Sequence, residues 1–203
     1  VSWTRPLALA VFLAILGGFT YWLEFQKKPK NEAAEQAAKK TLSLDGRQIH
    51  SILIQDASKT VELQCTTLAQ NLCRPGDLSR WKLQQPMQTS GDTANINALV
   101  SSLNYINIED KIDLSTEPAE KRAALLKEYK LDATSNRRVI RVTTSDGNAD
   151  GKKAGTPRID TVVLGDTHPI GNKIFALSGQ GDQLNEQTVL LLPNSVKAPF
   201  EKD

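Results

Sequence analysis

The chain has 203 residues, with 25 basic and 23 acidic side chains and a formal net charge of +2. This near balance leaves no basic patch interleaved with aromatic residues, which argues against nucleic acid as a partner. After the first 40 residues, about 160 remain, enough for one domain with its own hydrophobic core.

The first element along the chain is an uncharged apolar run at residues 6–23. As a helix it would be about 27 Å long, enough to cross the hydrocarbon core of a bilayer. Trp3 precedes the run, and Tyr21 and Trp22 close it, so aromatic side chains would lie at both membrane–water interfaces. We therefore expect a transmembrane anchor over residues 1–26, in contact with membrane lipid.

A cleaved signal peptide is the alternative to this anchor. The apolar core of a signal peptide is usually about 7 to 15 residues long and precedes a cleavage site of small residues, whereas Glu24 and lysines follow this run. The sequence favours the uncleaved anchor. The positive charges bear on the orientation of this anchor. Lys27, Lys28 and Lys30 follow the run and only Arg5 precedes it, and this count would place the domain in the cytoplasm.

Small residues recur every four positions within the expected anchor, at Ala10, Ala14 and Gly18. Such residues lie on one face of a helix, and in lipid they let two helix backbones approach closely. We expect this face to pack against an integral membrane protein partner. The alternative is coincidence in a segment rich in alanine and leucine.

Residues 27–40 separate the anchor from the domain. Residues 31–40 favour a helix but have no apolar stripe, and Pro29 interrupts the helix before them. We interpret this segment as a helical or flexible stalk, followed by the folded domain over residues 41–203.

Cys65 and Cys73 are the only cysteines. They flank a short segment between a strand-like run and an Arg-Pro-Gly turn, so a disulfide would close a small loop, as fits an oxidising compartment such as the bacterial periplasm. Two free buried thiols are the alternative. A metal site is disfavoured, because no second ligand pair lies close by and His50 and His168 are far apart along the chain. Together with the expected anchor, the cysteines predict a single-pass protein of the bacterial inner membrane with its domain facing the periplasm.

Within the domain, alternating or apolar runs at residues 49–55 and 60–65 predict a β-hairpin, and a third strand at 81–83 ends before Pro86. A helix should begin near residues 90–92 and bury one face. The apolar residues of that face are Ile96, Leu99, Val100, Leu103 and Ile106.

A shorter helix should follow, with Ser115 and Thr116 as candidate caps and Pro118 in its first turn. Strands alternate with turn-rich joins thereafter. They are expected at residues 138–144, 159–164, 173–178 and 188–192. Strands at both ends around two helices predict an α+β domain, with an antiparallel or mixed sheet and two packed helices.

Several segments resemble chemical sites without completing one. Residues 146–151 match the opening half of a calcium loop, but Pro157 stands where the bidentate glutamate should be. The glycine-rich run 178–182 does not open a helix, so we expect a hairpin turn there rather than a phosphate loop. His168 lies near Asp166, yet nothing in the spacing aligns a nucleophile with them. We expect no catalytic residue, cofactor site or metal ligand.

The order of landmarks along the domain resembles a known family. The landmarks are WKLQQP at 81–86, Asp92 at a helix start, YKLD at 129–132, SDG at 145–147, VLGD at 163–166 and VLLLP at 189–193. Together, across residues 42–200, they resemble a bacterial membrane-anchored family of unknown function found beside gliding-motility-type ABC transporters and their auxiliary components. The resemblance implies an extracytoplasmic domain on one anchor and ABC transporter subunits as partners. It brings no catalytic residues.

Two functions remain open at this point. The first is a non-enzymatic accessory or scaffold subunit of a bacterial envelope membrane complex. The second is a tethered periplasmic binding module for an envelope polymer, such as cell-wall glycan, or for another ligand. An enzyme lacks any supporting set of residues. The oligomeric state and the partner are not specified by the sequence.

Overall fold

The computed structural model describes residues 18, 19, 21, 39–42, 44, 47–66, 73, 80–146 and 156–200. The chain forms two compact units, Val1–Lys39 and Lys40–Asp203. In the first unit, Gly18 and Tyr21 are helical and exposed. Nowhere in the described part of the chain does a helix have both the length and the apolar character needed to cross a bilayer. The other positions on which the anchor was predicted, Trp3, Ala10, Ala14 and Trp22, lie outside the described residues.

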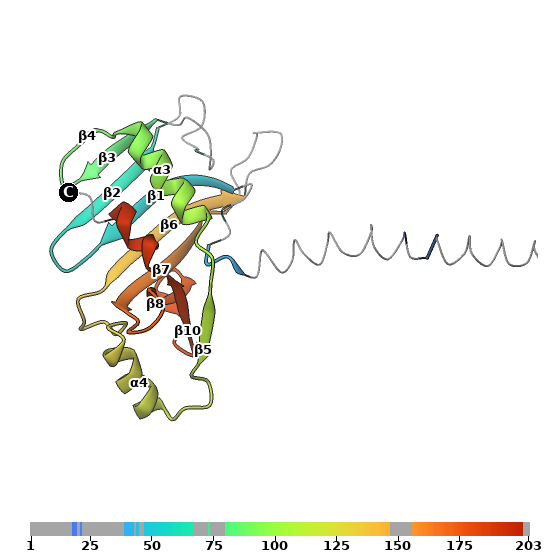
Figure 1. Ribbon diagram of the computed structural model, residues 1–203. Helices are drawn as coiled ribbons and strands as arrows, with labels where there is room; N and C mark the ends of the chain where they lie inside the picture. The colour runs from blue at the N-terminus through green and yellow to red at the C-terminus, as the bar shows by residue number, and fades with distance from the viewer. Residues whose placement is uncertain are drawn as a thin grey trace, which may run out of the picture. The chain divides into compact units, whose positions relative to one another are not determined.

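The second unit is built on one antiparallel sheet. Ten described strands form it in the order β4-β3-β2-β1-β6-β7-β8-β10-β5, and β9 pairs with β8 (Figure 1). Every strand pair is antiparallel. The strands are β1 (Arg47–Gln55), β2 (Thr60–Cys65), β3 (Trp81–Gln85), β4 (Thr89–Ser90), β5 (Asp110–Asp113), β6 (Arg138–Asp146), β7 (Arg158–Thr167), β8 (Lys173–Gln180), β9 (Gln183–Leu184) and β10 (Thr188–Pro193).

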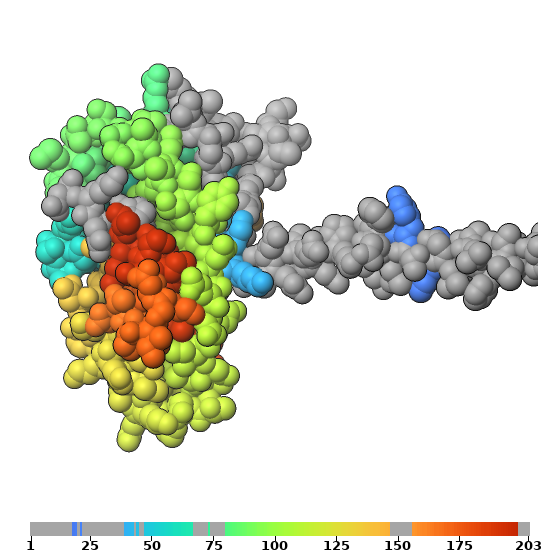
Figure 2. Space-filling model, viewed as in Figure 1, coloured from blue at the N-terminus to red at the C-terminus, as the bar shows by residue number. Residues whose placement is uncertain are grey.

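Two short α-helices and one 3-10 helix accompany the described strands. They are α3 (Thr93–Asn104), α4 (Ala119–Glu128) and η2 (Asn194–Phe200). The Asp92 side chain caps α3 by accepting from the amides of Ala94 and Asn95, which satisfies donors that have no partner within the helix. In Figure 1, α3 and η2 lie together over one face of the sheet, and Figure 2 shows them as neighbours on the surface of the domain.

The central strands are buried on both faces. Along β7, Val162 and Leu164 belong to the core shared with α3 and η2, whereas Val163 between them belongs to the core shared with α4. The same alternation holds in β8 and β10, because neighbouring side chains of a strand point to opposite faces. Because a hydrophobic core lies on each face of these strands, their sequences are continuous apolar runs rather than alternating ones.

A bulge in β1 places two isoleucines on one face. Ile49 and Ile52 are three residues apart, so in a regular strand they would point to opposite faces. The register against β6 shifts between Ile49 and Ser51, which inserts His50 as an extra residue. Both isoleucines are consequently fully buried in the core beneath α3.

The predicted fold class, a transmembrane helix followed by an α+β domain, is wrong. The described domain is mainly antiparallel β-sheet with two small helices, and no membrane-spanning helix is found among the described residues. The sequence pattern missed β4, β5 and β9, which have two to four residues each. Since β5 lies between the two helices in the chain and joins the sheet edge, the helices do not form a consecutive layer. The option of a mixed sheet is excluded for the described strands.

Candidate functional site

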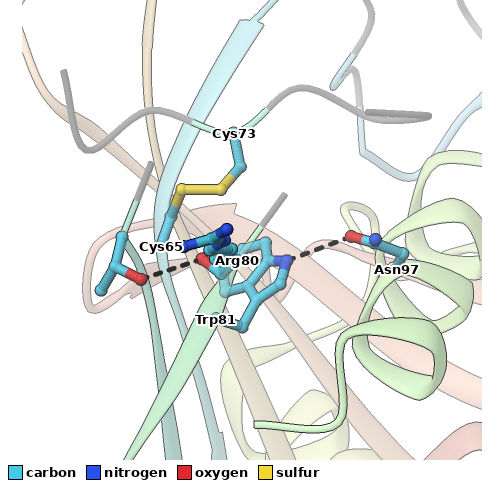
Figure 3. Close-up of a disulfide and its surroundings, with 6 residues drawn as sticks. Cys65, Cys73, Arg80, Trp81 and Asn97 are labelled. Atoms are coloured by element: carbon cyan, nitrogen blue, oxygen red, sulfur yellow. Dashed lines mark hydrogen bonds between the residues drawn. A yellow bond between two sulfur atoms is a disulfide. The ribbon is translucent and has the colours of Figure 1, made fainter. Parts of the chain in front are cut away.

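Cys65 and Cys73 form a disulfide, as predicted (Figure 3). Cys65 ends β2, and Cys73 pairs with Ile49 of β1 through two backbone hydrogen bonds of 2.6 and 3.2 Å. Both cysteines are buried in the core beneath α3. Cys73 is therefore joined to β2 by the disulfide and to β1 by backbone hydrogen bonds. The burial of the disulfide marks it as structural rather than reactive.

Trp81 lies beside this disulfide and joins it to α3. It pairs with Cys65 across β2 and β3, is buried, and donates from Nε1 to Oδ1 of Asn97 on α3 at 3.1 Å (Figure 3). A buried indole N–H usually finds such an acceptor. Trp81 is thus a core residue that fixes α3 on the sheet, and it presents no ring to a ligand.

The two histidines lie in separate environments. His50 Nε2 is 2.8 Å from the Ser145 hydroxyl, and burial lowers the pKa of His50, so its ring is neutral at neutral pH. Ser145 is only 1% exposed, which closes its hydroxyl to a substrate. His168 Nδ1 accepts from the Ile170 amide at 3.0 Å, and the ring packs against Phe175. Among the described residues, neither histidine has a hydrogen bond to an accessible nucleophile.

Several acidic residues in the described ranges form ion pairs with arginine or lysine. Asp160 is buried between Arg47 and Arg158, with contacts of 3.1 and 2.7 Å, so its charge is compensated on two sides. No group of three or more His, Cys, Asp or Glu residues in the described ranges could hold a metal ion. Of the calcium-like run 146–151, only Asp146 is described. In the glycine-rich run 178–182, the first three residues end β8, and Gly181 and Asp182 form the predicted turn to β9.

A pocket of about 360 Å³ is the most promising site in the described domain. It lies where the turn between β1 and β2, the start of β6, the end of β7 and η2 meet. Its walls are Asp56, Ala57, Ser58, Asn136, Arg137, Arg138, Leu164, Gly165 and Lys197.

The carboxylate in this pocket is held by its own turn. Oδ1 of Asp56 accepts from the amides of Ser58 and Lys59, both at 2.9 Å, and from the Ser58 hydroxyl at 2.8 Å. The Ser58 amide contributes most, and with the Ser58 hydroxyl, the Lys59 amide and the nearby Arg138 charge it lowers the pKa of Asp56 to about 2. Asp56 is therefore ionised at neutral pH and unsuited to accept or release protons there.

Arg138 is the least satisfied cation of the pocket. Its Nη2 lies 3.4 Å from Oδ2 of Asp56, longer than the roughly 2.7 to 2.9 Å of a strong charged hydrogen bond. Its Nε is buried and has no hydrogen-bond partner among the described residues. A guanidinium offers five N–H donors, and a buried donor left unpaired destabilises the fold.

The other two cations of the pocket, Lys197 and Arg137, have different hydrogen-bond partners. Lys197 of η2 donates from Nζ to the Thr167 hydroxyl at 3.2 Å. Arg137 also lines a second, smaller hollow of about 170 Å³ and donates to the Leu131 carbonyl. The pocket is thus positive overall, because its walls hold three cations, Arg137, Arg138 and Lys197, and one carboxylate, Asp56.

The sequence patterns did not single out this pocket. Asp56 and Arg138 are 82 residues apart, and they meet because β1 pairs with β6, with Gln55 opposite Val139. An acidic turn and a basic pair before a strand are each ordinary in sequence. Only the pairing of the two strands turns them into a site.

No family model, curated protein or solved structure matches this chain. The resemblance to the membrane-anchored family therefore stays a prediction from the landmark residues.

Proposed function

We propose that this chain is a non-enzymatic accessory or scaffold subunit of a bacterial envelope membrane complex, which recognises its partner through the folded domain. The observation that carries the proposal is the chemistry of the Asp56–Arg138 pocket. Catalysis by proton transfer needs a group that titrates near the working pH. None of the described residues that line the pocket is a histidine or a cysteine, and the one carboxylate among them is held ionised. Fixed charges of this kind suit binding.

The disulfide supports a periplasmic location for the domain. A buried disulfide persists in an oxidising compartment and is rare in the bacterial cytoplasm. We propose attachment to the inner membrane, which rests on the sequence of residues 6–23 alone. Subunits of an ABC transporter are the partners that the family resemblance implies.

Purification of the full chain in mild detergent tests the accessory function. We expect integral membrane proteins to co-purify in fixed stoichiometry, because a subunit is held by its complex. A chain that purifies alone from its native membrane would contradict the proposal.

The second candidate, a tethered binding module for an envelope polymer or ligand, is also favoured by the pocket. It makes a different prediction, namely a chain that purifies alone and binds isolated envelope polymer. Mixing the purified chain with sedimented envelope polymer and measuring what remains in solution separates the two candidates.

A further inference from the structure

Two cations in the wall of the pocket have no carboxylate partner in the described part of the chain. Arg137 donates to the Leu131 carbonyl, and Lys197 donates to the Thr167 hydroxyl at 3.2 Å, so both are held by neutral groups. Both cations are half-buried, where water and salt screen a charge less than at an open surface. Two like charges therefore face one pocket without a balancing anion among the described residues.

The carboxylates near the pocket are matched to other cations. Asp56 faces Arg138, with 3.4 Å between Oδ2 and Nη2. Asp166, next in the chain after a wall residue, forms an ion pair of 2.6 Å with Lys130. The charge of Lys197 also lowers the pKa of Asp166, but the hydrogen bond from Lys130 lowers it most. The three cations and one carboxylate of the wall thus leave two positive charges for a ligand.

The unpaired cations also have hydrogen-bond donors to spare. A guanidinium has five N–H donors and an ammonium has three, and the contacts of Arg137 and Lys197 to the Leu131 carbonyl and the Thr167 hydroxyl use one of each. Among the described residues, neither cation has a buried nitrogen without a partner. Their remaining donors are therefore open to solvent and accessible to a ligand.

We propose that the Asp56–Arg138 pocket binds a phosphate monoester, with Arg137 and Lys197 as the contacting cations. A phosphate monoester carries about −1.5 to −2 at neutral pH, which matches two positive charges, whereas a single carboxylate matches one. Arginine forms paired hydrogen bonds with phosphate oxygens, and lysine binds phosphate as a point charge. Arg138 contributes its charge while it stays paired with Asp56.

The pocket is larger than a phosphate group alone. At about 30 Å³ for each molecule of liquid water, the five heavy atoms of a phosphate group occupy roughly 150 Å³. The volume of about 360 Å³ therefore leaves room for a small organic group attached to the phosphate. Asn136 and Ser58 line the pocket with an amide and a hydroxyl, so we expect that organic group to be polar.

A titration of the full chain in neutral detergent micelles, followed by ¹H–¹⁵N NMR, tests this inference. The probe is glycerol 3-phosphate. The controls, at the same ionic strength, are dimethyl phosphate, a diester with one negative charge, and succinate, a dianion without phosphorus. We expect glycerol 3-phosphate to shift the amide signals of Ser58, Gly165 and Lys197 in a saturable way, and to bind more tightly than either control.

A second arm identifies the source of the phosphate. Dioctanoyl phosphatidic acid, whose headgroup is a phosphate monoester, is mixed into the micelles in place of the soluble probe, with dioctanoyl phosphatidylcholine, a diester, as its control. The same shifts with glycerol 3-phosphate support a soluble ligand. Shifts with phosphatidic acid alone support a lipid headgroup.

Matched variants assign the contact. Lys197→Gln and Arg137→Gln should each weaken binding by about ten-fold, because each removes one charged donor group, and Lys197→Arg should retain binding. Lys121→Gln is the control, since Lys121 is an exposed cation of α4 that pairs with Glu117 outside the pocket wall. It removes the same charge from the chain and should leave the affinity unchanged. If Arg137→Gln fails to fold, Lys197→Gln and Lys197→Arg still decide the question.

Four results would overturn the inference. They are no saturable shift in either arm up to about 50 mM probe, where a millimolar site would be nearly filled; equal binding of dimethyl phosphate; tighter binding of succinate; and an unchanged affinity in Lys197→Gln.

The phosphate site goes beyond the accessory function and does not depend on it, because the charges of the pocket are the same for either candidate function. Partners that co-purify with a chain that ignores both phosphate probes reject the phosphate site alone. A chain that binds a probe and purifies without partners rejects the accessory function alone.

Discussion

Single residues shape the Asp56–Arg138 pocket from opposite sides. Oδ1 of Asp56 accepts hydrogen bonds within its own turn, and Oδ2 forms the ion pair with Arg138. The turn between β1 and β2 is thereby connected to the start of β6. On the far wall, Gly165 permits a close approach of chain segments. A Cβ at this position would lie 2.3 Å from the Tyr129 carbonyl oxygen and 2.9 Å from Leu131 Cδ2.

Asp56→Asn should destabilise the fold at pH 7 by about 1 to 2 kcal/mol, because the neutral amide loses the charged hydrogen bonds and leaves Arg138 without its ion pair. The folded-state pKa of Asp56 is about 2, below its ordinary value of 3.8. Its contribution is therefore present above pH 3.8 and is lost as the pH falls toward 2. Urea unfolding across this range measures the difference between wild type and variant, which should shrink as the pH falls.

Asp182→Asn is the control for this measurement. Asp182 forms an exposed ion pair with Arg141, its side chain being 90% exposed, and such pairs contribute little. An Asp56→Asn difference that stays constant from pH 7 to 2 would contradict the role assigned to the carboxylate.

Gly165→Ala should destabilise the domain by about 1 to 3 kcal/mol, because the new methyl group meets a backbone carbonyl that cannot rotate away. Gly91→Ala is the matched comparison, since its Cβ would mainly meet the mobile end of the Ile96 side chain at 2.4 Å. Thermal or urea unfolding should show the larger loss for Gly165→Ala. Equal losses would show that packing at Gly165 is not tight.

At the scale of secondary-structure elements, features of the sheet edges reduce their tendency to pair with strands of another chain. The strands β4 and β9 have two residues each, and the Lys111 amide in edge strand β5 is bonded to the Asp110 carboxylate at 2.8 Å. Short strands and charged side chains reduce the tendency of an edge to pair with another chain. The disulfide acts near the other end of the sheet, where β1, β2 and the Cys73 segment are joined.

Replacing both Cys65 and Cys73 with alanine should lower the free energy of unfolding by roughly 2 to 3 kcal/mol. A disulfide across a sequence separation of 8 restricts the unfolded chain by about this amount. Urea unfolding of the variant, and of wild type with and without reductant, measures the loss. In protein from its native compartment, alkylation without reductant should label neither cysteine, and two labelled thiols would reject the disulfide in the cell.

At the scale of the whole molecule, the disulfide and the count of positive charges indicate opposite orientations. The lysines after residue 26 favour a cytoplasmic domain, whereas a buried disulfide requires oxidising surroundings. We give the disulfide the greater weight, because Cys65 and Cys73 are buried in the core and oxidised. The lysine count is the weaker argument, because charges beyond the two flanks of the apolar run also affect orientation.

If the domain lies outside the cytoplasm, as we propose, a membrane-impermeant protease added to intact spheroplasts should digest it. Immunoblotting for the domain provides the readout, and a cytoplasmic protein that stays intact is the control for leakage. A domain fully protected until detergent is added would place it in the cytoplasm.

Local signals in the sequence determined much of the domain. The strand predicted at 60–65 coincides with β2, and the run at 49–55 lies within β1. Asp92 is the cap of α3, and the four later strands and the paired cysteines are present as predicted. These features depend on side-chain period, capping and spacing, which neighbouring residues express by themselves.

Only the tertiary structure decided the fold class and the candidate site. Strands of two to four residues, such as β4 and β5, are too short to show a period, and they exist because a neighbouring strand supplies their hydrogen bonds. Likewise, Asp56 and Arg138 become partners only when β1 pairs with β6. Pairing between distant strands is a property of both partners and of the core that holds them together, so no local pattern in either segment could reveal the pocket.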